Sequence, residues 1–296
     1  MIGALLQELR PKQWTKNFLV FAGIIFAQRL GDRALLLRAF AGFVAFSLLS
    51  GIVYLVNDLR DADADRLHPK KRHRPIASGQ LSAAAAWGAL PVLLAAAGAL
   101  SWWLGPGFVW VAVAYVASNL AYSWGLKHHV ILDVFIIASG FVLRAVAGVE
   151  LLKPVAPETQ MSSWLLMCTF FGALFLGASK RSRELANAGP SAPSQRAVLA
   201  SYTPELLDRM LTVSAATTIL SYALYTIWPA TVEKFHTEKL IITVPVVAYG
   251  VFRYLHLVRV SETSEDPSQV LVSDRPIQAA VVLYFVIALW ILYVAR

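Results

Sequence analysis

Residues Val56–Gly79, VNDLRDADADRLHPKKRHRPIASG, join an acidic run to a basic run in a chain that is otherwise apolar. Of its 296 residues, 57% are hydrophobic and 15% are charged, whereas about a quarter of the residues in soluble domains are charged. The apolar residues gather in uncharged runs of roughly 20, the length that crosses about 30 Å of hydrocarbon. Composition therefore excludes an ordinary soluble domain and predicts an all-α polytopic membrane protein.

Nine segments are apolar enough to be predicted as spanning helices. They lie near residues 16–30, 35–56, 82–104, 107–124, 130–149, 162–179, 206–228, 239–259 and 276–294. The first is short and starts from a basic segment that contains Trp, so we expect it to enter the membrane at an angle. The opening residues, MIGALLQELRPKQW, show no basic region before an apolar core and no small-residue cleavage site, so no signal peptide is expected.

Lys and Arg outnumber Asp and Glu by 26 to 18. A nucleic-acid partner could explain this excess, but most basic residues fall in loops on one side, as the positive-inside rule requires. We therefore expect no nucleic-acid partner and predict one transmembrane domain, residues 1–296, in the cell (inner) membrane. Its N-terminus and active-site loops would face the cytoplasm, and its C-terminus would lie outside. The loops in question are near 57–81, 125–129, 180–205 and 260–275.

Three carboxylates of the acidic run are predicted to share a helix face. Asp58, Asp61 and Asp65 are spaced by three, four and seven residues, with Asn57 beside them, whereas Asp63 points away. Like charges this close repel, so we expect a cation between them. Mg²⁺ suits hard carboxylate oxygens and keeps positions for water and phosphate. A solvated, self-neutralising loop is the alternative, but the preceding apolar run enters the acidic residues without a turn residue.

Charged groups elsewhere are expected at the same membrane face. Asp133 and Arg144 fall on nearly one face of an apolar segment, where charges usually mark a functional interior; a structural ion pair is the alternative. Lys180 and Arg181 end the sixth apolar span, with Glu184 one turn on, and could equally be positive-inside anchors. Together with the acidic residues, these groups predict a site for Mg²⁺ and a phosphorylated ligand beside lipid, without naming the ligand.

The segment NDLRDADADRLHPKKRHRPIASG resembles the first Asp-rich motif of the UbiA superfamily of intramembrane prenyltransferases. That motif reads N-D-x-x-D-x-x-x-D, then a basic stretch and R-P-[IL]-A-[SA]-G. The resemblance implies nine membrane helices around a central cavity. Most members carry a second Asp-rich motif, but the corresponding YSWGLKHHVILD holds only Asp133. With RPKQWTKN, LRAVAG and SKRSREL, this departure looks like the decaprenyl-phosphate phosphoribosyltransferase branch.

The branch implies transfer of 5-phosphoribose from phosphoribosyl pyrophosphate to a polyprenyl phosphate, with release of pyrophosphate, for cell-wall arabinan precursors. Asp58, Asp61 and Asp65 would act in catalysis and hold Mg²⁺. The residues expected to bind substrate are Lys16, Asn17, Asn57, Arg74, Tyr122, Lys127, Asp133, Arg144, Lys180, Arg181 and Glu184. The expected partners are the two substrates and the membrane, and a homo-oligomer is left open.

Two other functions compete with this interpretation. The first is a prenyltransferase of the same fold that joins a prenyl diphosphate to an aromatic or other acceptor; it would need a second Asp cluster within 122–145, which the chain lacks. The second is a transporter that uses intramembrane charges as a relay. Transporters often contain inverted repeats, and the sequence repeats only the short RPI of Arg74–Ile76 before a later helix.

Overall fold

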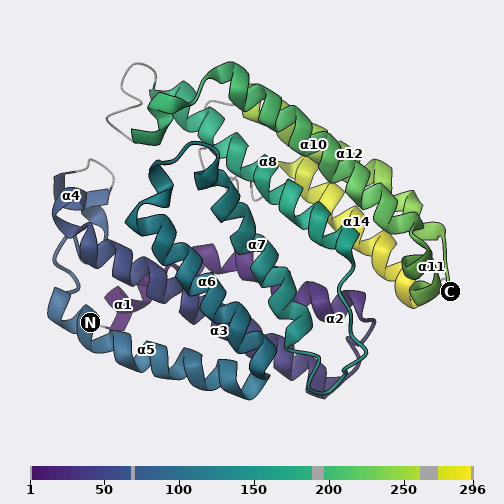
Figure 1. Cartoon of the computed structure of the whole chain (residues 1–296), viewed down its shortest axis with the longest axis horizontal. Coiled ribbons are helices and arrows are strands. Elements are labelled where there is room, and N and C mark those ends of the chain that lie inside the picture. Colours follow the sequence, from purple (N-terminus) through teal and green to yellow (C-terminus); the bar gives the residue numbers. More distant parts are fainter. Residues whose placement is uncertain (1, 68–70, 189–196, 261–272, 295–296) are drawn as a thin grey trace. The chain divides into compact units, whose positions relative to one another are not determined.

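The computed structural model describes residues 2–67, 71–188, 197–260 and 273–294 (Figure 1). These residues form helices and connecting turns, with no strand among them, so the all-α prediction is confirmed. The chain divides into two compact units: unit 1 comprises Met1–Trp124 and Leu143–Gln160, and unit 2 comprises Gly125–Val142 and Met161–Arg296. Parts of three predicted loops, at 68–70, 189–196 and 261–272, lie outside the described residues.

Unit 1 begins with short elements and continues into long helices. They are α1 (Ile2–Glu8), η1 (Pro11–Phe21), α2 (Ala22–Phe26), α3 (Arg33–Arg60), α4 (Ala62–Leu67), η2 (Lys71–His73), α5 (Ala83–Leu104), α6 (Pro106–Trp124) and the second half of α7 (Leu132–Glu150). Unit 2 holds η3 (Leu126–His128), the first half of α7, α8 (Ser163–Ala188), η5 (Ala197–Ser201), α10 (Pro204–Ile227), α11 (Pro229–Phe235), η6 (Lys239–Thr243), α12 (Val244–Val260) and α14 (Arg275–Tyr293).

Seven helices in the described part of the chain are long and apolar enough to cross a membrane. They are α3, α5, α7, α8, α10, the continuous stretch Lys239–Val260 and α14. The expected count of nine spans is not confirmed. The predicted span 107–124 is present as α6, outside this set of seven. The predicted span 16–30 falls on η1 and α2; α2 ends at Phe26, and the chain turns two residues later at Gln28, which has a positive φ of 57°.

Helix α3 carries the acidic run at its end. Asp32 caps its start, since its Oδ1 accepts hydrogen bonds from the backbone N–H groups of Ala34 and Leu35 at 2.9 and 3.2 Å. The 28 residues of α3 extend about 42 Å, more than the hydrocarbon thickness. Asp61 ends α3 and α4 follows at once, so the acidic residues stay on nearly continuous helix, as predicted.

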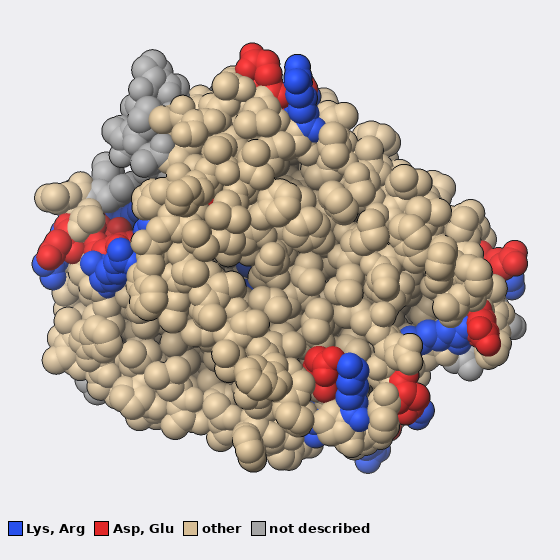
Figure 2. Space-filling view, viewed as in Figure 1, with Lys and Arg blue, Asp and Glu red and all other residues tan. Residues whose placement is uncertain are grey.

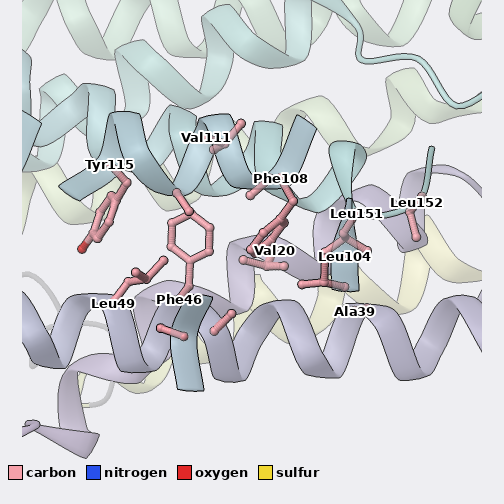
Figure 3. Packing of buried hydrophobic residues seen from close by; sticks show 14 of the residues in the cluster. Val20, Ala39, Phe46, Leu49, Leu104, Phe108, Val111, Tyr115, Leu151 and Leu152 are labelled. Atoms are coloured by element: carbon pink, nitrogen blue, oxygen red, sulfur yellow. The ribbon is translucent and has the colours of Figure 1, made fainter. Parts of the chain in front are cut away.

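Aromatic packing joins α3 to α6 in the core of unit 1 (Figure 3). The ring of Phe46 lies 5.7 Å from that of Phe108, edge to face, and 5.1 Å from that of Tyr115. Leu49 and Val111 are buried in the same cluster. The position of Tyr115, on which one of the polar clusters described below depends, is therefore set by apolar contacts.

Arg38 fixes the opposite end of the unit 1 helices from the acidic run. Its Nε donates to the carbonyl of Leu151 at 2.6 Å and its Nη2 to the carbonyl of Leu104 at 2.5 Å. These carbonyls close α7 and α5, where helices present unpaired acceptors and the negative end of their dipole. The buried cation thus satisfies two helix ends, and Trp103 covers it with its ring 5.1 Å away.

Unit 2 is built on the packing of α8 against α10, with α12 and α14 alongside (Figure 1). The ring of Phe175 on α8 lies 5.4 Å from that of Tyr254 on α12. Asp274 caps α14 and also pairs with Arg253 at 2.9 Å. This hydrogen bond lowers the pKa of Asp274 from its ordinary value, so the pair joins α12 to the start of α14.

Most of the face shown in Figure 2 is formed by residues other than Lys, Arg, Asp and Glu, and nearly all the charged side chains on it lie in a few groups. Large apolar side chains are exposed on several helices; on α5, Trp87 is 57% exposed, Val92 69% and Trp102 81%. Apolar surface on this scale marks contact with lipid or protein rather than with water. The chain is therefore a multi-pass membrane protein by both its helices and its surface.

Helices α2 and α7 approach closely enough in unit 1 that only glycine fits between their backbones. A Cβ added to Gly23 would overlap the carbonyl of Gly148. We expect Gly23→Ala to lower the unfolding temperature in detergent by about 5 °C or more, because overpacking costs about 1–3 kcal/mol. Gly88→Ala is the matched control, since a Cβ there meets nothing within 4 Å. Equal unfolding temperatures for the two variants would contradict the close approach.

Candidate functional site

Two carboxylates of the acidic run converge on one guanidinium nitrogen in unit 1. Nη1 of Arg74 donates to Asp58 Oδ1 at 2.9 Å and to Asp65 Oδ2 at 2.6 Å. Both aspartates are 3% exposed. Lys71 adds a second cation, with its Nζ 3.8 Å from Asp65 Oδ1. The seven-residue spacing and the returning basic segment therefore bring together the acidic and basic halves of the run.

The exposure of the two kinds of side chain differs sharply. The carboxylates of Asp58 and Asp65 have side chains that are 4% exposed, whereas the side chains of Arg74 and Lys71 are 28% and 44% exposed. The cations thus cover the anions. An anionic ligand that approaches unit 1 at this point meets positive groups first and carboxylates beneath them.

Arg10 approaches Asp58 from the N-terminal segment. Its Nη2 donates to Asp58 Oδ2 at 2.5 Å, and its guanidinium lies 4.4 Å from the ring centre of Tyr54. A positive φ of 53° at Arg10, directly before Pro11, turns the chain between α1 and η1. Sequence reasoning did not select Arg10 for the site, although it opens the RPKQWTKN motif.

Glu8 is the second group in this region that the sequence did not reveal. It ends α1, is 1% exposed, and neither carboxylate oxygen has a hydrogen-bond partner among the described residues. Burial, and then the neighbouring Asp58 carboxyl, raise the pKa of Glu8 to about 8. A lone glutamate in a short helix carries no sequence signal for such a position.

The side chains of this region have the chemistry to bind a metal ion, but they are not arranged as a complete set of metal ligands. No three His, Cys, Asp or Glu side chains within the described ranges are grouped to hold a metal ion. Asp61 is half-buried, and Asp63 is exposed and pairs with Arg66 at 2.6 Å, as its predicted outward direction requires. The buried aspartates and the unsatisfied carboxyl of Glu8 nevertheless supply hard oxygen donors of the kind Mg²⁺ prefers. The predicted metal ligands stay a prediction.

A second polar cluster surrounds Arg144 in unit 1. Its Nε donates to Asn17 Oδ1 at 2.7 Å and its Nη2 to the Tyr115 hydroxyl at 2.9 Å. Asn17 in turn donates to the hydroxyl of Ser47 at 3.1 Å. The structure thus brings together two predicted residues, Asn17 and Arg144, and adds Tyr115, which looked like any aromatic residue of an apolar helix.

A third cluster lies in unit 2, at the start of α7. Nε of Arg181 donates to Asp133 Oδ2 at 2.7 Å, and its Nη1 donates to Glu184 Oε2 at 2.5 Å. The Tyr202 hydroxyl donates to Asp133 Oδ1 at 2.6 Å and accepts from the backbone N–H of Ile131 at 2.8 Å. Burial, together with the hydrogen bond to Asp133, raises the pKa of Tyr202 above its usual range. Tyr202 was not predicted, because it lies 69 residues from Asp133.

The alternative interpretation of Asp133 and Arg144 was a structural ion pair, and the structure shows such a pair between Asp133 and Arg181. Asp133 pairs with Arg181, whereas Arg144 is held by Asn17 and Tyr115. Arg181 is 1% exposed and Asp133 is fully buried. The buried pair of Asp133 and Arg181 therefore stabilises the packing at the start of α7.

The remaining predicted residues fall in both units. Lys16, Asn57, Tyr122 and Lys127 are half-buried. Lys180 lies with its Nζ 3.9 Å from Glu184 Oε1, and its side chain is 42% exposed. The predicted residues of unit 2 are Lys127, Asp133, Lys180, Arg181 and Glu184, and the others belong to unit 1. The expected convergence of all of them on one site stays a prediction.

Comparison with known proteins identifies related sequences. A family model described as the UbiA prenyltransferase family matches residues 17–273. Decaprenyl-phosphate phosphoribosyltransferase of Mycolicibacterium smegmatis is 39% identical over 229 residues, which cover 76% of this chain and 70% of that protein. The protein of the same name from Mycobacterium tuberculosis is 38% identical, with 76% and 74% covered.

Solved structures show a similar fold. A UbiA homolog from Archaeoglobus fulgidus bound to GPP and Mg²⁺ matches with a TM-score of 0.71 and 20% identity, covering 98% of this chain and all of that one. The same homolog bound to DMAPP and Mg²⁺ matches with a TM-score of 0.70 and 19% identity, covering 98% and 99%. At this identity the likeness speaks for the fold alone.

Two adjacent basic residues on α8, Lys180 and Arg181, allow a structural role to be distinguished from a binding role by mutation. We expect Arg181→Met to lower the unfolding temperature by about 10 °C, because it leaves Asp133 buried without its cation, at a cost of about 3–5 kcal/mol. Lys180→Met, one residue away and partly exposed, should shift it by no more than about 2 °C. Thermal unfolding of both variants in the same detergent checks this, and a smaller loss for Arg181→Met than for Lys180→Met would contradict it.

Proposed function

The chain belongs to the UbiA prenyltransferase family, and we propose that this membrane transferase moves 5-phosphoribose from phosphoribosyl pyrophosphate to a polyprenyl phosphate. The name of its relatives, decaprenyl-phosphate phosphoribosyltransferase, supports the substrate pair. The observation that carries the proposal is the convergence of Asp58 and Asp65 on Arg74, with cations outermost. Such a site offers positive groups to phosphates and carboxylates to a divalent cation.

Magnesium is the cofactor we propose, held by Asp58 and Asp65 with Asp61 beside them. When bound, it would neutralise charge on the departing pyrophosphate. Two structures of similar fold contain Mg²⁺ with a prenyl diphosphate, which supports the cofactor generally. In this chain Arg74 already contacts both carboxylates, so a metal ion that binds them competes with its guanidinium.

The partly exposed cations are the groups proposed to bind the donor's phosphates. A guanidinium has five N–H donors, and one nitrogen of Arg74 serves both carboxylates. Other donors of Arg74, with Arg10 and Lys71, can therefore hold phosphate oxygens. Charge-assisted hydrogen bonds of this kind are roughly twice as strong as neutral ones.

The acceptor needs little activation by the protein. A phosphate monoester has a second pKa near 6, so at pH 7 a polyprenyl phosphate is mostly dianionic and attacks without a general base. The task left to side chains is orientation and charge. We assign Arg144, held by Asn17 and Tyr115, to shaping the apolar part of unit 1, and Arg181 to holding the start of α7.

The sidedness of unit 1 supports a site at one membrane surface. Arg38 and Asp58 are 20 residues apart on α3, a rise of about 30 Å, which matches the hydrocarbon thickness. Arg10, Arg74 and Asp58 gather at the end of α3 that we place at the cytoplasmic surface of the inner membrane, because the basic loops lie there. The C-terminus would then lie outside, and the product would feed cell-wall arabinan precursors.

The alternative, transfer of a prenyl group to an aromatic or other acceptor, draws support from the prenyl diphosphates in the structures of similar fold. That reaction in this family calls for a second acidic motif. The one carboxylate at its position, Asp133, is fully buried and paired with Arg181. A carboxylate neutralised in this way is a poor ligand for a second metal ion, so the phosphoribosyl donor is favoured.

The decisive assay follows labelled ribose phosphate from phosphoribosyl pyrophosphate into polyprenyl phosphate in detergent with Mg²⁺. We expect transfer, its loss with EDTA, and its recovery when Mg²⁺ is restored. Asp58→Asn and Asp65→Asn should each lower kcat/KM at least about 100-fold, because each removes a carboxylate ligand of the metal ion that would neutralise the departing pyrophosphate. The exposed Asp63→Asn is the matched control and should stay within about twofold.

If the folded protein transfers no ribose phosphate but does transfer a prenyl group from a prenyl diphosphate, the alternative function is supported. Thermal unfolding of Asp58→Asn and Asp65→Asn must accompany the assay, because both side chains are buried. Loss of activity with unchanged unfolding temperature places the effect in the reaction.

The configuration of the product tests the course of the reaction. Attack by the lipid phosphate opposite the departing pyrophosphate inverts the anomeric carbon, through a centre with oxocarbenium character. We therefore expect a β-linked polyprenyl phosphoribose from the α-configured donor. Proton NMR of the anomeric position in the purified product measures this, and a retained α configuration would rule out direct displacement.

A further inference from the structure

Glu8 presents an unsatisfied carboxyl inside the protein. Helix α1 packs through Ala4 and Leu5 against a buried apolar cluster that includes Leu55 and Ile76. This packing carries Glu8, the last residue of the helix, to 1% exposure, and both of its carboxylate oxygens lack a hydrogen-bond partner in the described part of the chain. A buried carboxyl without a partner is costly, so its retention calls for an explanation.

The neighbour of Glu8 is the first aspartate of the acidic run. The Asp58 carboxyl is close enough to Glu8 to contribute to its raised pKa. The oxygens of Asp58 accept hydrogen bonds from Arg10 and Arg74. The Glu8 oxygens accept none from either residue in the described part of the chain, and Arg10 acts on Glu8 only through its charge. Two carboxyls thus lie side by side in a buried place, and only one of them is satisfied by protein groups.

We propose that Glu8 is an additional ligand of the divalent cation bound at Asp58, supplied by the N-terminal segment and not by the acidic run. The inference rests on the proposed function, in that it takes the Asp58 region to bind a metal ion. Hard oxygens adjacent to an aspartate are the donors that Mg²⁺ and Mn²⁺ accept. A cation bound there satisfies the Glu8 oxygens and removes the repulsion between the two carboxylates.

The proposal also gives α1 a role in the site. Arg10 lies two residues after Glu8 and contacts Asp58 from the same segment. The turn at Arg10, with its positive φ, holds both side chains toward the end of α3. The competing account is that Glu8 stays protonated and shares its proton with Asp58, in which case it contributes nothing to metal binding.

The test measures Mn²⁺ binding directly, by the electron paramagnetic resonance signal of free Mn²⁺, with the purified full-length protein in detergent and Mg²⁺ as competitor. We expect Glu8→Gln, which keeps the shape of the side chain, to raise the Kd for Mn²⁺ about tenfold or more. Glu158→Gln is the matched control; its side chain is 64% exposed and pairs with Arg29, so its Kd should stay within about twofold of the parent's.

The outcomes separate this inference from the proposed function. If Glu8→Gln binds Mn²⁺ as tightly as the parent while Asp58→Asn loses binding, the metal site stands and the role of Glu8 is refuted. If the parent and Asp58→Asn bind alike, the metal site itself is wrong, and the inference falls with it. Should Glu8→Gln not fold, Glu8→Asp carries the test: it keeps the charge and draws the carboxylate back by one methylene, so an unchanged Kd overturns the proposal.

Discussion

The shared contact of Asp58 and Asp65 with Arg74 is the constraint on which the described site depends. Two carboxylates that are nearly shut off from water repel each other and lose their hydration, so a buried pair of this kind needs a cation beside it. Arg74 supplies that cation from beyond the η2 turn, and Arg10 adds another from the N-terminal segment. The end of α3, the acidic run and the first residues of the chain are thereby tied into one electrostatic unit.

Charges elsewhere in the apolar helices obey the same rule by different means. Arg38 is satisfied by helix-terminal carbonyls, and Asp133 by Arg181 and Tyr202. In these two cases the charged group is buried together with its partners, so its hydrogen bonds and ion pairs serve to hold the helices together. At Asp58 and Asp65 the anions are buried but their cations remain partly exposed. That difference in exposure is the reason we propose the ligand site at Asp58 and Asp65.

Helical spacing and apolar runs in the sequence predicted the features that depend on residues close together in the chain. Helical spacing predicted that Asp58, Asp61 and Asp65 share a face and that Asp63 points away. Asp58 and Asp65 do meet, at Arg74, and Asp63 is exposed, whereas Asp61 is half-buried. Apolar runs located the long helices. The span expected at 16–30 was wrong as a continuous helix, because the chain there follows a 3₁₀ path and turns at Gln28. Contacts between distant segments had no local signal: Arg10 meets Asp58 across 48 residues and Tyr202 meets Asp133 across 69.

Asp133 links these observations to substrate choice. Its carboxylate stands alone where relatives with two acidic motifs would place several, and Arg181 neutralises it. Among the described residues, the one carboxylate at this position is already paired, which disfavours a second metal-binding cluster there. Under the proposed function, the charge of the donor's diphosphate would then be met mainly at the Asp58 region, where Arg10, Lys71 and Arg74 contact the two aspartates. We therefore propose a soluble, highly charged sugar diphosphate as the donor rather than a prenyl diphosphate, whose binding gains from apolar surface more than from added positive charge.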